Sequence, residues 1–95
     1  MRIDEQEHKA LKQATRDVEG EVYLFGSRVD AKAKGGDIDI LIMTGEDTFE
    51  VSRKVTVQFQ MVCDEKIDVL AMPPDNRTNE QERFLQSLNK LVRIK

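Results

Sequence analysis

The sequence predicts a small α/β (α+β) domain in which a mixed or parallel sheet of three to four strands is flanked by helices. Short apolar runs at residues 21–25, 38–43 and 66–72 have the length and composition of buried strands. Segments with helical spacing precede, separate and follow these runs, which gives the order α-β-α-β-α-β-α. Parallel strands need such crossovers, and the helices then cover the sheet.

Composition narrows the class of protein. The 95 residues suit one domain, residues 1–95, and 39% hydrophobic with 35% charged residues allow one modest core. The net charge of −3 disfavours an extended nucleic-acid contact surface. Cys63 is the single cysteine, so an internal disulfide is impossible, and the charged first residues do not resemble a signal peptide. With no apolar run of membrane-spanning length, we expect a cytoplasmic protein that does not enter a membrane.

Residues 3–18 have the spacing of an amphipathic helix, for which Gly20 is a suitable stop. The stripe that faces the core is expected to contain Ile3, Leu11, Ala14 and Val18. The following strand, residues 21–25, is apolar on both faces, which predicts a central strand covered on two sides. Ser27 is a candidate cap for a short helix over residues 28–33, and residues 34–36 form a tight loop before the next strand.

Residues 48–63 fit two patterns. One set of apolar residues alternates with polar ones, as in a strand: Val55, Val57, Phe59 and Met61. Another set has helical spacing: Val51, Val55, Phe59 and Val62. We choose the helix, capped by Asp47 or Thr48, because the run is long for a strand and the flanking strands need a crossover.

The third strand, residues 66–72, contains Asp68 within its apolar run and ends at two prolines. A final helix is expected to begin at Thr78 or Asn79, since Thr78-x-x-Gln81 fits a capping box, and to end near residue 89. Its inward-facing residues are predicted to be Phe84, Leu85, Leu88 and Leu91. Residues 91–94 either add a short edge strand or trail away from the sheet.

Two groups of residues beside the first two strands suit nucleotide binding. Asp37 and Asp39 are two residues apart on an extended segment and therefore share one face, while Ile38 points into the core. Neighbouring carboxylates repel each other, and a divalent cation relieves that repulsion. Gly26 and Ser27 offer backbone N–H groups and a hydroxyl that suit a phosphate. Taken alone, a Gly-Ser turn is an ordinary strand-to-helix connection, and an Asp-x-Asp pair occurs by chance in many surface strands.

Gly26-Ser27, nine intervening residues and Asp37-Ile38-Asp39 resemble the signature of the nucleotidyltransferase superfamily that includes DNA polymerase β. The form GSRVDAKAKGGDIDILI is most similar to the minimal nucleotidyltransferases, small proteins often encoded beside a helical HEPN partner. This resemblance implies the small nucleotidyltransferase fold, a nucleoside triphosphate as substrate (ATP or another NTP), and Mg²⁺, with two ions in the site.

The resemblance also implies roles for individual residues. Asp37, Asp39 and Asp68 would be the catalytic and metal-binding carboxylates, with Asp68 acting on the attacking hydroxyl. Gly26 and Ser27 would hold the β- and γ-phosphates through backbone amides and the serine hydroxyl.

Two of the candidate residues have structural alternatives. Arg28 either adds a positive charge to the bound triphosphate or forms an ion pair with Asp30 or another neighbouring acid. Asp68, considered by itself, could pair with Lys66 or with an arginine instead of a metal ion.

Three functions stay open. The first is a metal-dependent nucleotidyltransferase that moves AMP onto a hydroxyl of a partner protein, as an antitoxin acting on a HEPN toxin. The second is a catalytically silent binding module that neutralises its partner by contact alone. The third is a small-molecule nucleotidyltransferase, which the lack of an acceptor domain in this sequence disfavours. A homo- or hetero-oligomer is compatible with each of them.

Overall fold

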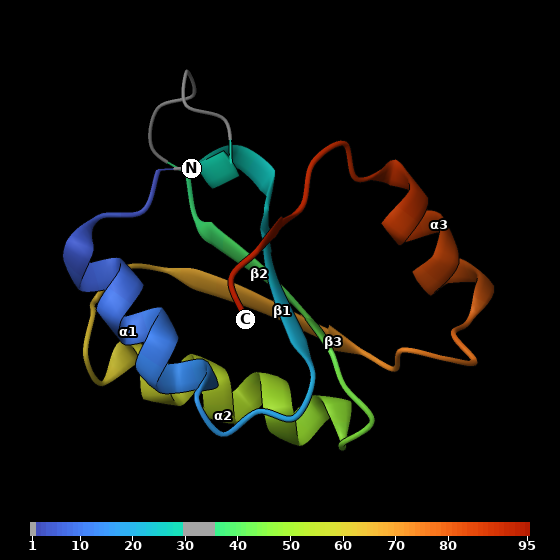
Figure 1. Cartoon of the computed structure of the whole chain (residues 1–95), viewed down its shortest axis with the longest axis horizontal. Coiled ribbons are helices and arrows are strands. Elements are labelled where there is room, and N and C mark those ends of the chain that lie inside the picture. The colour runs from blue at the N-terminus through green and yellow to red at the C-terminus, as the bar shows by residue number, and fades with distance from the viewer. Residues whose placement is uncertain (1, 30–35) are drawn as a thin grey trace.

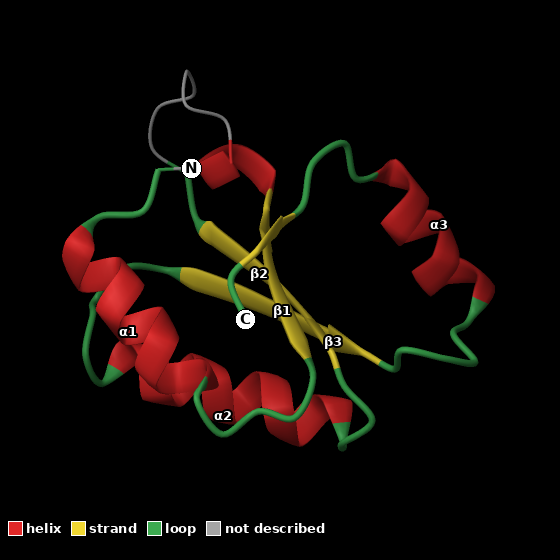
Figure 2. Cartoon of the chain, in the orientation of Figure 1, coloured by secondary structure: helices red, strands yellow, loops and turns green. Residues whose placement is uncertain are grey.

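The computed structural model describes residues 2–29 and 36–95, and all elements below lie in these ranges. The helices are α1 (Glu5–Thr15), α2 (Thr48–Gln60) and α3 (Asn79–Ser87), and a 3-10 turn, η1, spans Gly26–Val29. The strands are β1 (Glu21–Phe25), β2 (Ile38–Met43), β3 (Ile67–Met72) and β4 (Val92–Arg93). They form one sheet in the order β3-β2-β1-β4 (Figures 1 and 2). Because β2 pairs in parallel with β3, whereas β1 is antiparallel to both β2 and β4, the sheet is mixed, and the predicted fold class is confirmed.

The main core lies between one face of the sheet and helices α1 and α2, which lie side by side (Figure 1). Alternate residues of the strands point into it, as the period of an extended chain requires. Its fully buried members include Val22, Leu24, Ile38, Ile40 and Ile42 from the sheet and Ala10, Leu11, Val55 and Phe59 from the two helices. The predicted inward direction of the isoleucines around Asp39 is therefore confirmed.

The helix over residues 48–60 agrees with the choice of helix over strand for this segment. Asp47 caps it, because its carboxylate accepts a hydrogen bond from the Glu50 N–H at 3.0 Å. Thr78 and Gln81 form the predicted capping box at the start of α3. None of the helices within residues 2–29 and 36–95 is long and apolar enough to cross a membrane.

Helix α1 ends three residues before the predicted boundary, and a residue from the far end of the sequence explains why. The Lys95 ammonium donates to the carbonyl oxygens of Thr15 at 2.7 Å and Arg16 at 3.0 Å, and also to that of Val18. These carbonyls would otherwise need partners at a helix end. The cation also lies where the helix dipole favours positive charge, so a tertiary contact stabilises the early termination.

The connection after β1 differs from the prediction of a helix that starts at residue 28. The 3-10 turn η1 begins at Gly26 itself, so Ser27 lies inside the turn instead of capping it. Most of the predicted helix and the first two residues of the predicted loop, residues 34 and 35, lie outside the described residues. The last loop residue, Gly36, has a φ of +89°, a conformation that suits glycine.

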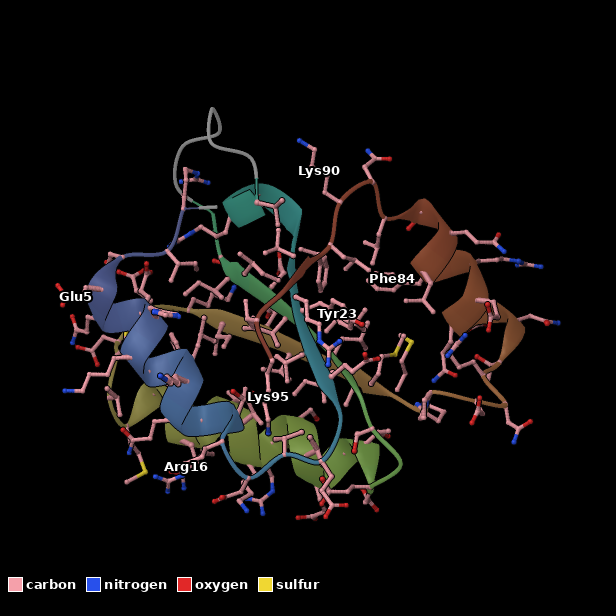
Figure 3. The ribbon with its side chains drawn as sticks, viewed as in Figure 1. Glu5, Arg16, Tyr23, Phe84, Lys90 and Lys95 are labelled. Atoms are coloured by element: carbon pink, nitrogen blue, oxygen red, sulfur yellow. The ribbon has the colours of Figure 1, made fainter. Side chains whose placement is uncertain are left out.

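The second face of the sheet is covered less fully than predicted. Tyr23 and Phe25 on this face are only partly buried, and no residue of α3 is fully buried. Helix α3 lies beside the sheet and reaches it through Phe84, whose ring meets the Phe25 ring edge-on at a centroid distance of 5.6 Å (Figure 3). The prediction that Leu91 faces inward is wrong, because this side chain is 42% exposed. The segment after β3 carries the chain past the end of the sheet before α3 begins (Figure 1). Leu41 and Met72 on this face are nevertheless almost fully buried, so the face is accessible only in part.

Candidate functional site

Acidic side chains meet on the second face, at the end of the sheet where β2 and β3 begin. In the parallel pairing, Asp39 stands directly opposite Asp68, so the two side chains project from the same face on neighbouring strands. Asp37 immediately precedes β2, two residues before Asp39. The structure thus brings together the two acids of the Asp-x-Asp pair and the third acid from the next strand. Asp68 is exposed and Asp39 partly buried, so both carboxylates face the accessible side of the sheet.

The pKa of Asp39 is sensitive to the nearby carboxylates of Asp68 and Asp37. Partial burial raises the pKa of its carboxyl group above the ordinary value, and the negative charges of Asp68 and then Asp37 raise it further. A carboxyl group whose pKa is raised by the charges of neighbouring carboxylates lies in a field of negative charge. Such a field attracts a cation, and perturbed carboxyl groups of this kind concentrate at functional sites.

We name Gly26 and Ser27 of η1 the phosphate turn, after the role predicted for them from the sequence. Two close backbone approaches lie beside this turn and the acids. Gly26 has a φ of +77°, and a β-carbon built on it would lie 2.4 Å from Oδ2 of Asp39. A β-carbon on Gly36 would lie 2.1 Å from the hydroxyl oxygen of Ser27. Both glycines therefore leave room for polar side chains of the site.

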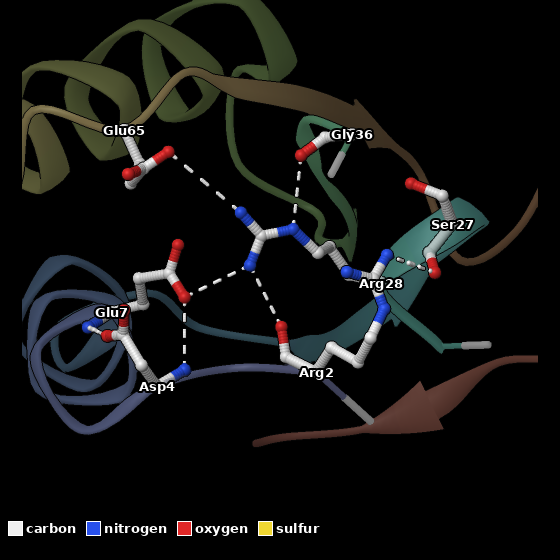
Figure 4. A network of polar contacts seen from close by, with 7 residues as sticks. All are labelled: Arg2, Asp4, Glu7, Ser27, Arg28, Gly36 and Glu65. Atoms are coloured by element: carbon white, nitrogen blue, oxygen red, sulfur yellow. Dashed lines mark hydrogen bonds and ion pairs between the residues drawn. The ribbon is translucent and has the colours of Figure 1, made fainter. Parts of the chain in front are cut away.

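Arg28 is held in an ion pair instead of pointing into this space (Figure 4). Its guanidinium contacts the Glu7 carboxylate at 3.0 Å and that of Glu65 at 3.9 Å. Of the two alternatives for Arg28, the ion pair is the one the structure describes, with partners other than Asp30, which lies outside the described residues. The signal for this was in the first helix, where Glu7 occupies a position of the apolar stripe between Ile3 and Leu11 and is 3% exposed.

A metal ion fits the chemistry of the three acids, although the side chains are not gathered around a single point. Carboxylate oxygens are the ligands that Mg²⁺ prefers. Within the described residues, however, no three His, Cys, Asp or Glu side chains are grouped closely enough to hold an ion as they stand. Oδ2 of Asp37 lies 3.5 Å from the ammonium nitrogen of Lys66. Because this ion pair is exposed to solvent, it contributes little to stability. Metal binding would require Asp37 to exchange this contact for the ion. Lys66, proposed as an alternative partner of Asp68, thus contacts Asp37 instead.

A cleft of about 580 Å³ opens beside the phosphate turn, a volume in the range of small-ligand sites. Its walls come from the end of β1, from η1 and from the segment after α3, and they include Phe25, Gly26, Val29, Leu88 and Lys90. Figure 3 shows Lys90 on the segment that follows α3, on the same side of the sheet as Phe84. No periodic pattern or motif indicates this cleft in advance, because it forms between segments more than fifty residues apart.

Comparison with known proteins agrees with this arrangement. A family described as "Polymerase beta, Nucleotidyltransferase" matches residues 7–93, which is nearly the whole chain. The chain therefore belongs to the polymerase β-type nucleotidyltransferase family. The match includes the phosphate turn and all three acids. No curated protein shows a significant match to the sequence.

Proposed function

We propose that this protein transfers a nucleoside monophosphate, AMP from ATP, to a hydroxyl group of a partner protein. The observation that carries the proposal is the placement of Asp37, Asp39 and Asp68 beside a glycine turn, where partial burial and then the charges of Asp68 and Asp37 raise the pKa of Asp39. Membership of the nucleotidyltransferase family implies a nucleoside triphosphate substrate and, in general, a divalent metal. The adjacent cleft supplies a space of suitable size for a nucleotide that extends from the phosphate turn.

In this proposal, the acids and the phosphate turn have different roles according to their positions. Asp37 and Asp39 would hold two Mg²⁺ ions, with Asp68 as a further ligand, and the ions when bound would offset the charge on the phosphates and on the reacting oxygens. The N–H groups of Gly26 and Ser27 would hold the β- and γ-phosphates. Asp68, on the exposed edge strand, would accept the proton of the attacking hydroxyl.

In the transfer step, a bond forms between the acceptor oxygen and the α-phosphorus. The bond from the α-phosphorus to the bridging oxygen breaks, and pyrophosphate leaves with its electron pair. The proton of the acceptor hydroxyl goes to the Asp68 carboxylate. Because Asp68 is exposed and belongs to the edge strand β3, the acceptor would approach it from the outer side of that strand.

The partner we propose is a helical protein of the HEPN type, modified and silenced by this chain acting as an antitoxin. The support is the resemblance of the Gly-Ser and Asp-x-Asp segment to the minimal nucleotidyltransferases. The test incubates the protein with each labelled nucleoside triphosphate, Mg²⁺ and the product of the neighbouring gene, followed by intact-mass measurement. A gain of one or more nucleoside monophosphates on the partner, dependent on Asp39, supports the proposal. Stable binding to the partner without any mass change would refute transfer.

The second candidate is a module that neutralises a partner by binding alone. Two observations favour it: the acids are not gathered as a metal site in the described residues, and exposed apolar side chains lie on α2 and directly after it. These are Phe49 and Val57 on the helix and Met61 just beyond its end, which are 71%, 46% and 75% exposed. They are candidates for contact with a partner protein. Substitution of Phe49 by Ser should disrupt complex formation under this candidate, whereas Asp39→Asn should leave neutralisation intact.

A further inference from the structure

A network of polar contacts joins the start of α1 to the phosphate turn (Figure 4). At its centre is the Arg28 guanidinium, with only 11% of the side chain exposed. It donates hydrogen bonds to Oε1 of Glu7 at 3.0 Å and to the backbone carbonyls of Arg2 at 2.8 Å and Gly36 at 3.1 Å. We refer to Arg2, Glu7, Ser27, Arg28, Gly36 and Glu65, the residues drawn with Asp4 in Figure 4, as the Arg28 network.

The acidic partner of Arg28 is itself fixed in place. Oε1 of Glu7 also accepts a hydrogen bond from the Asp4 N–H at 3.0 Å, which completes the capping box of α1. The hydrogen bond to Glu7 raises the pKa of Arg28, against the opposing effect of burial. The guanidinium is therefore a charged group with three of its N–H donors, on Nε and Nη1, committed to fixed acceptors, and its Glu7 partner belongs to the helix that packs on the core.

The network sets the direction of two peptide groups of the site. The Ser27 carbonyl accepts from the Arg2 guanidinium at 3.0 Å, and the Gly36 carbonyl accepts from Nε of Arg28. In a trans peptide the N–H of the next residue points the opposite way from the carbonyl, and the described residues contain no cis peptide. The N–H groups of Arg28 and Asp37 are therefore turned away from the network; the first belongs to η1 directly after the phosphate turn, and the second belongs to the first acid.

We propose that Arg28 is a positioning residue that keeps the phosphate turn and the acid pair at a fixed spacing and does not itself contact the triphosphate. The planar guanidinium binds the Glu7 carboxylate of α1, the Arg2 carbonyl before α1 and the Gly36 carbonyl before β2. It therefore connects η1 with the start of α1 and with the start of β2. A lysine offers a point charge on a flexible chain and cannot replace this fork of donors. The consequence for nucleotide affinity rests on the proposed nucleotidyl transfer, whereas the spacing itself exists in the ligand-free protein.

The experiment compares Arg28→Met, Arg28→Lys and Glu7→Gln. It also includes the double variant that combines Arg28→Met with Glu7→Gln. Glutamine at position 7 keeps the capping box, because glutamine also serves at its third position, and removes only the charge. The matched controls are Arg53→Met and Glu50→Gln, which break an ion pair of the same two residue types on α2. That pair is more than 60% exposed on both sides and has an N–O distance of 3.4 Å.

Two measurements are made on each variant. Calorimetry with Mg²⁺·ATP should show Arg28→Met, Arg28→Lys and Glu7→Gln each weakening the affinity about tenfold. The double variant should be no weaker than Arg28→Met, because both changes remove the same interaction. Amide hydrogen exchange without ligand should become at least several-fold faster in residues 26–29 and 36–38 of these variants. The α2 controls should match the wild type in both measurements.

Two results would overturn the proposal. If Glu7→Gln or Arg28→Lys binds Mg²⁺·ATP as tightly as the wild type while Arg28→Met does not, Arg28 contributes a charge directly to the phosphates. Unchanged exchange in residues 26–29 and 36–38 would show that the network does not hold the turn. If the wild type binds no nucleotide, the proposed function fails, and exchange alone then decides the role of Arg28. Should Arg28→Met not fold, Glu7→Gln and Arg28→Lys carry the comparison.

Discussion

Replacement of Gly26 by alanine tests the phosphate turn where it meets the acids. Gly26 has a φ of +77°, and its added β-carbon would lie 2.4 Å from Oδ2 of Asp39. The left-handed conformation costs an L-residue roughly 1–2 kcal/mol. The Asp39 carboxylate can rotate away from the new methyl group, at about 0.5–1.5 kcal/mol for a strained rotamer. We expect a total loss of about 1.5–3.5 kcal/mol in the free energy of unfolding, which lowers the Tm of a chain of this length by roughly 6–28 °C.

The same substitution should weaken Mg²⁺·ATP binding at least tenfold, because the displaced Asp39 carboxylate no longer faces the site. Two other glycines provide controls. Gly45→Ala should leave the Tm and affinity close to wild type, since its β-carbon meets nothing within 4 Å. Gly20→Ala should lower the Tm without changing the affinity of the folded protein. Its φ is +144°, and its β-carbon would lie 2.0 Å from the carbonyl oxygen of Met43, at the other end of β2 from Asp39.

Differential scanning fluorimetry and isothermal calorimetry, the latter below the lowest Tm of the series, give both quantities. The reasoning is refuted if Gly26→Ala melts together with Gly45→Ala. It is also refuted if Gly26→Ala is destabilised like Gly20→Ala but binds Mg²⁺·ATP with wild-type affinity. The first outcome would show that the backbone of the turn is not strained by a side chain, and the second that Asp39 does not serve the nucleotide.

Four further expectations concern the acids. Because the folded-state pKa of Asp39 is raised, the folded protein binds this proton more tightly than the unfolded chain, so stability falls as the pH rises from about 4 through the folded pKa. Asp39→Asn should therefore raise the Tm of the metal-free protein at pH 7, flatten its pH dependence in thermal melts, and abolish transfer. Mg²⁺ with ATP at a hundredfold excess over Kd should stabilise the wild type by about 2.7 kcal/mol, and no shift at millimolar ligand would favour the binding module. Asp37→Asn should lose nucleotide binding in calorimetry, whereas Asp68→Asn should keep much of it and lose transfer in the mass assay; unfolding of Asp68→Asn alone would instead mark Asp68 as structural. Lys66→Met should tighten Mg²⁺ binding by up to about fivefold, because the exposed ion pair with Asp37 is worth at most about 1 kcal/mol, and weaker binding would contradict that competition.

Several features of the fold depend only on residues that are close together in the sequence. The sequence by itself determined these features. The alternation of Asp39 with buried Ile38 and Ile40 follows from the period of two in an extended chain. The capping box of Thr78 and Gln81 depends on hydrogen bonds across three residues, so the residue types alone identify it. The position of the phosphate turn directly after a buried strand could be predicted for the same reason.

The tertiary structure decided what depends on contacts between distant segments. The register that sets Asp68 opposite Asp39 is chosen by the pairing of β2 with β3, which is fixed by the packing of both strands on the core. Lys95, at the far end of the sequence, binds the carbonyl oxygens at the end of α1. No pattern within residues 3–18 predicts this contact. Arg28 had several acids within reach along the sequence, but the carboxylate it binds belongs to Glu7, 21 residues away. Such choices minimise the free energy of the whole chain, because a buried charge takes whichever fixed partner the packed helices and strands bring to it.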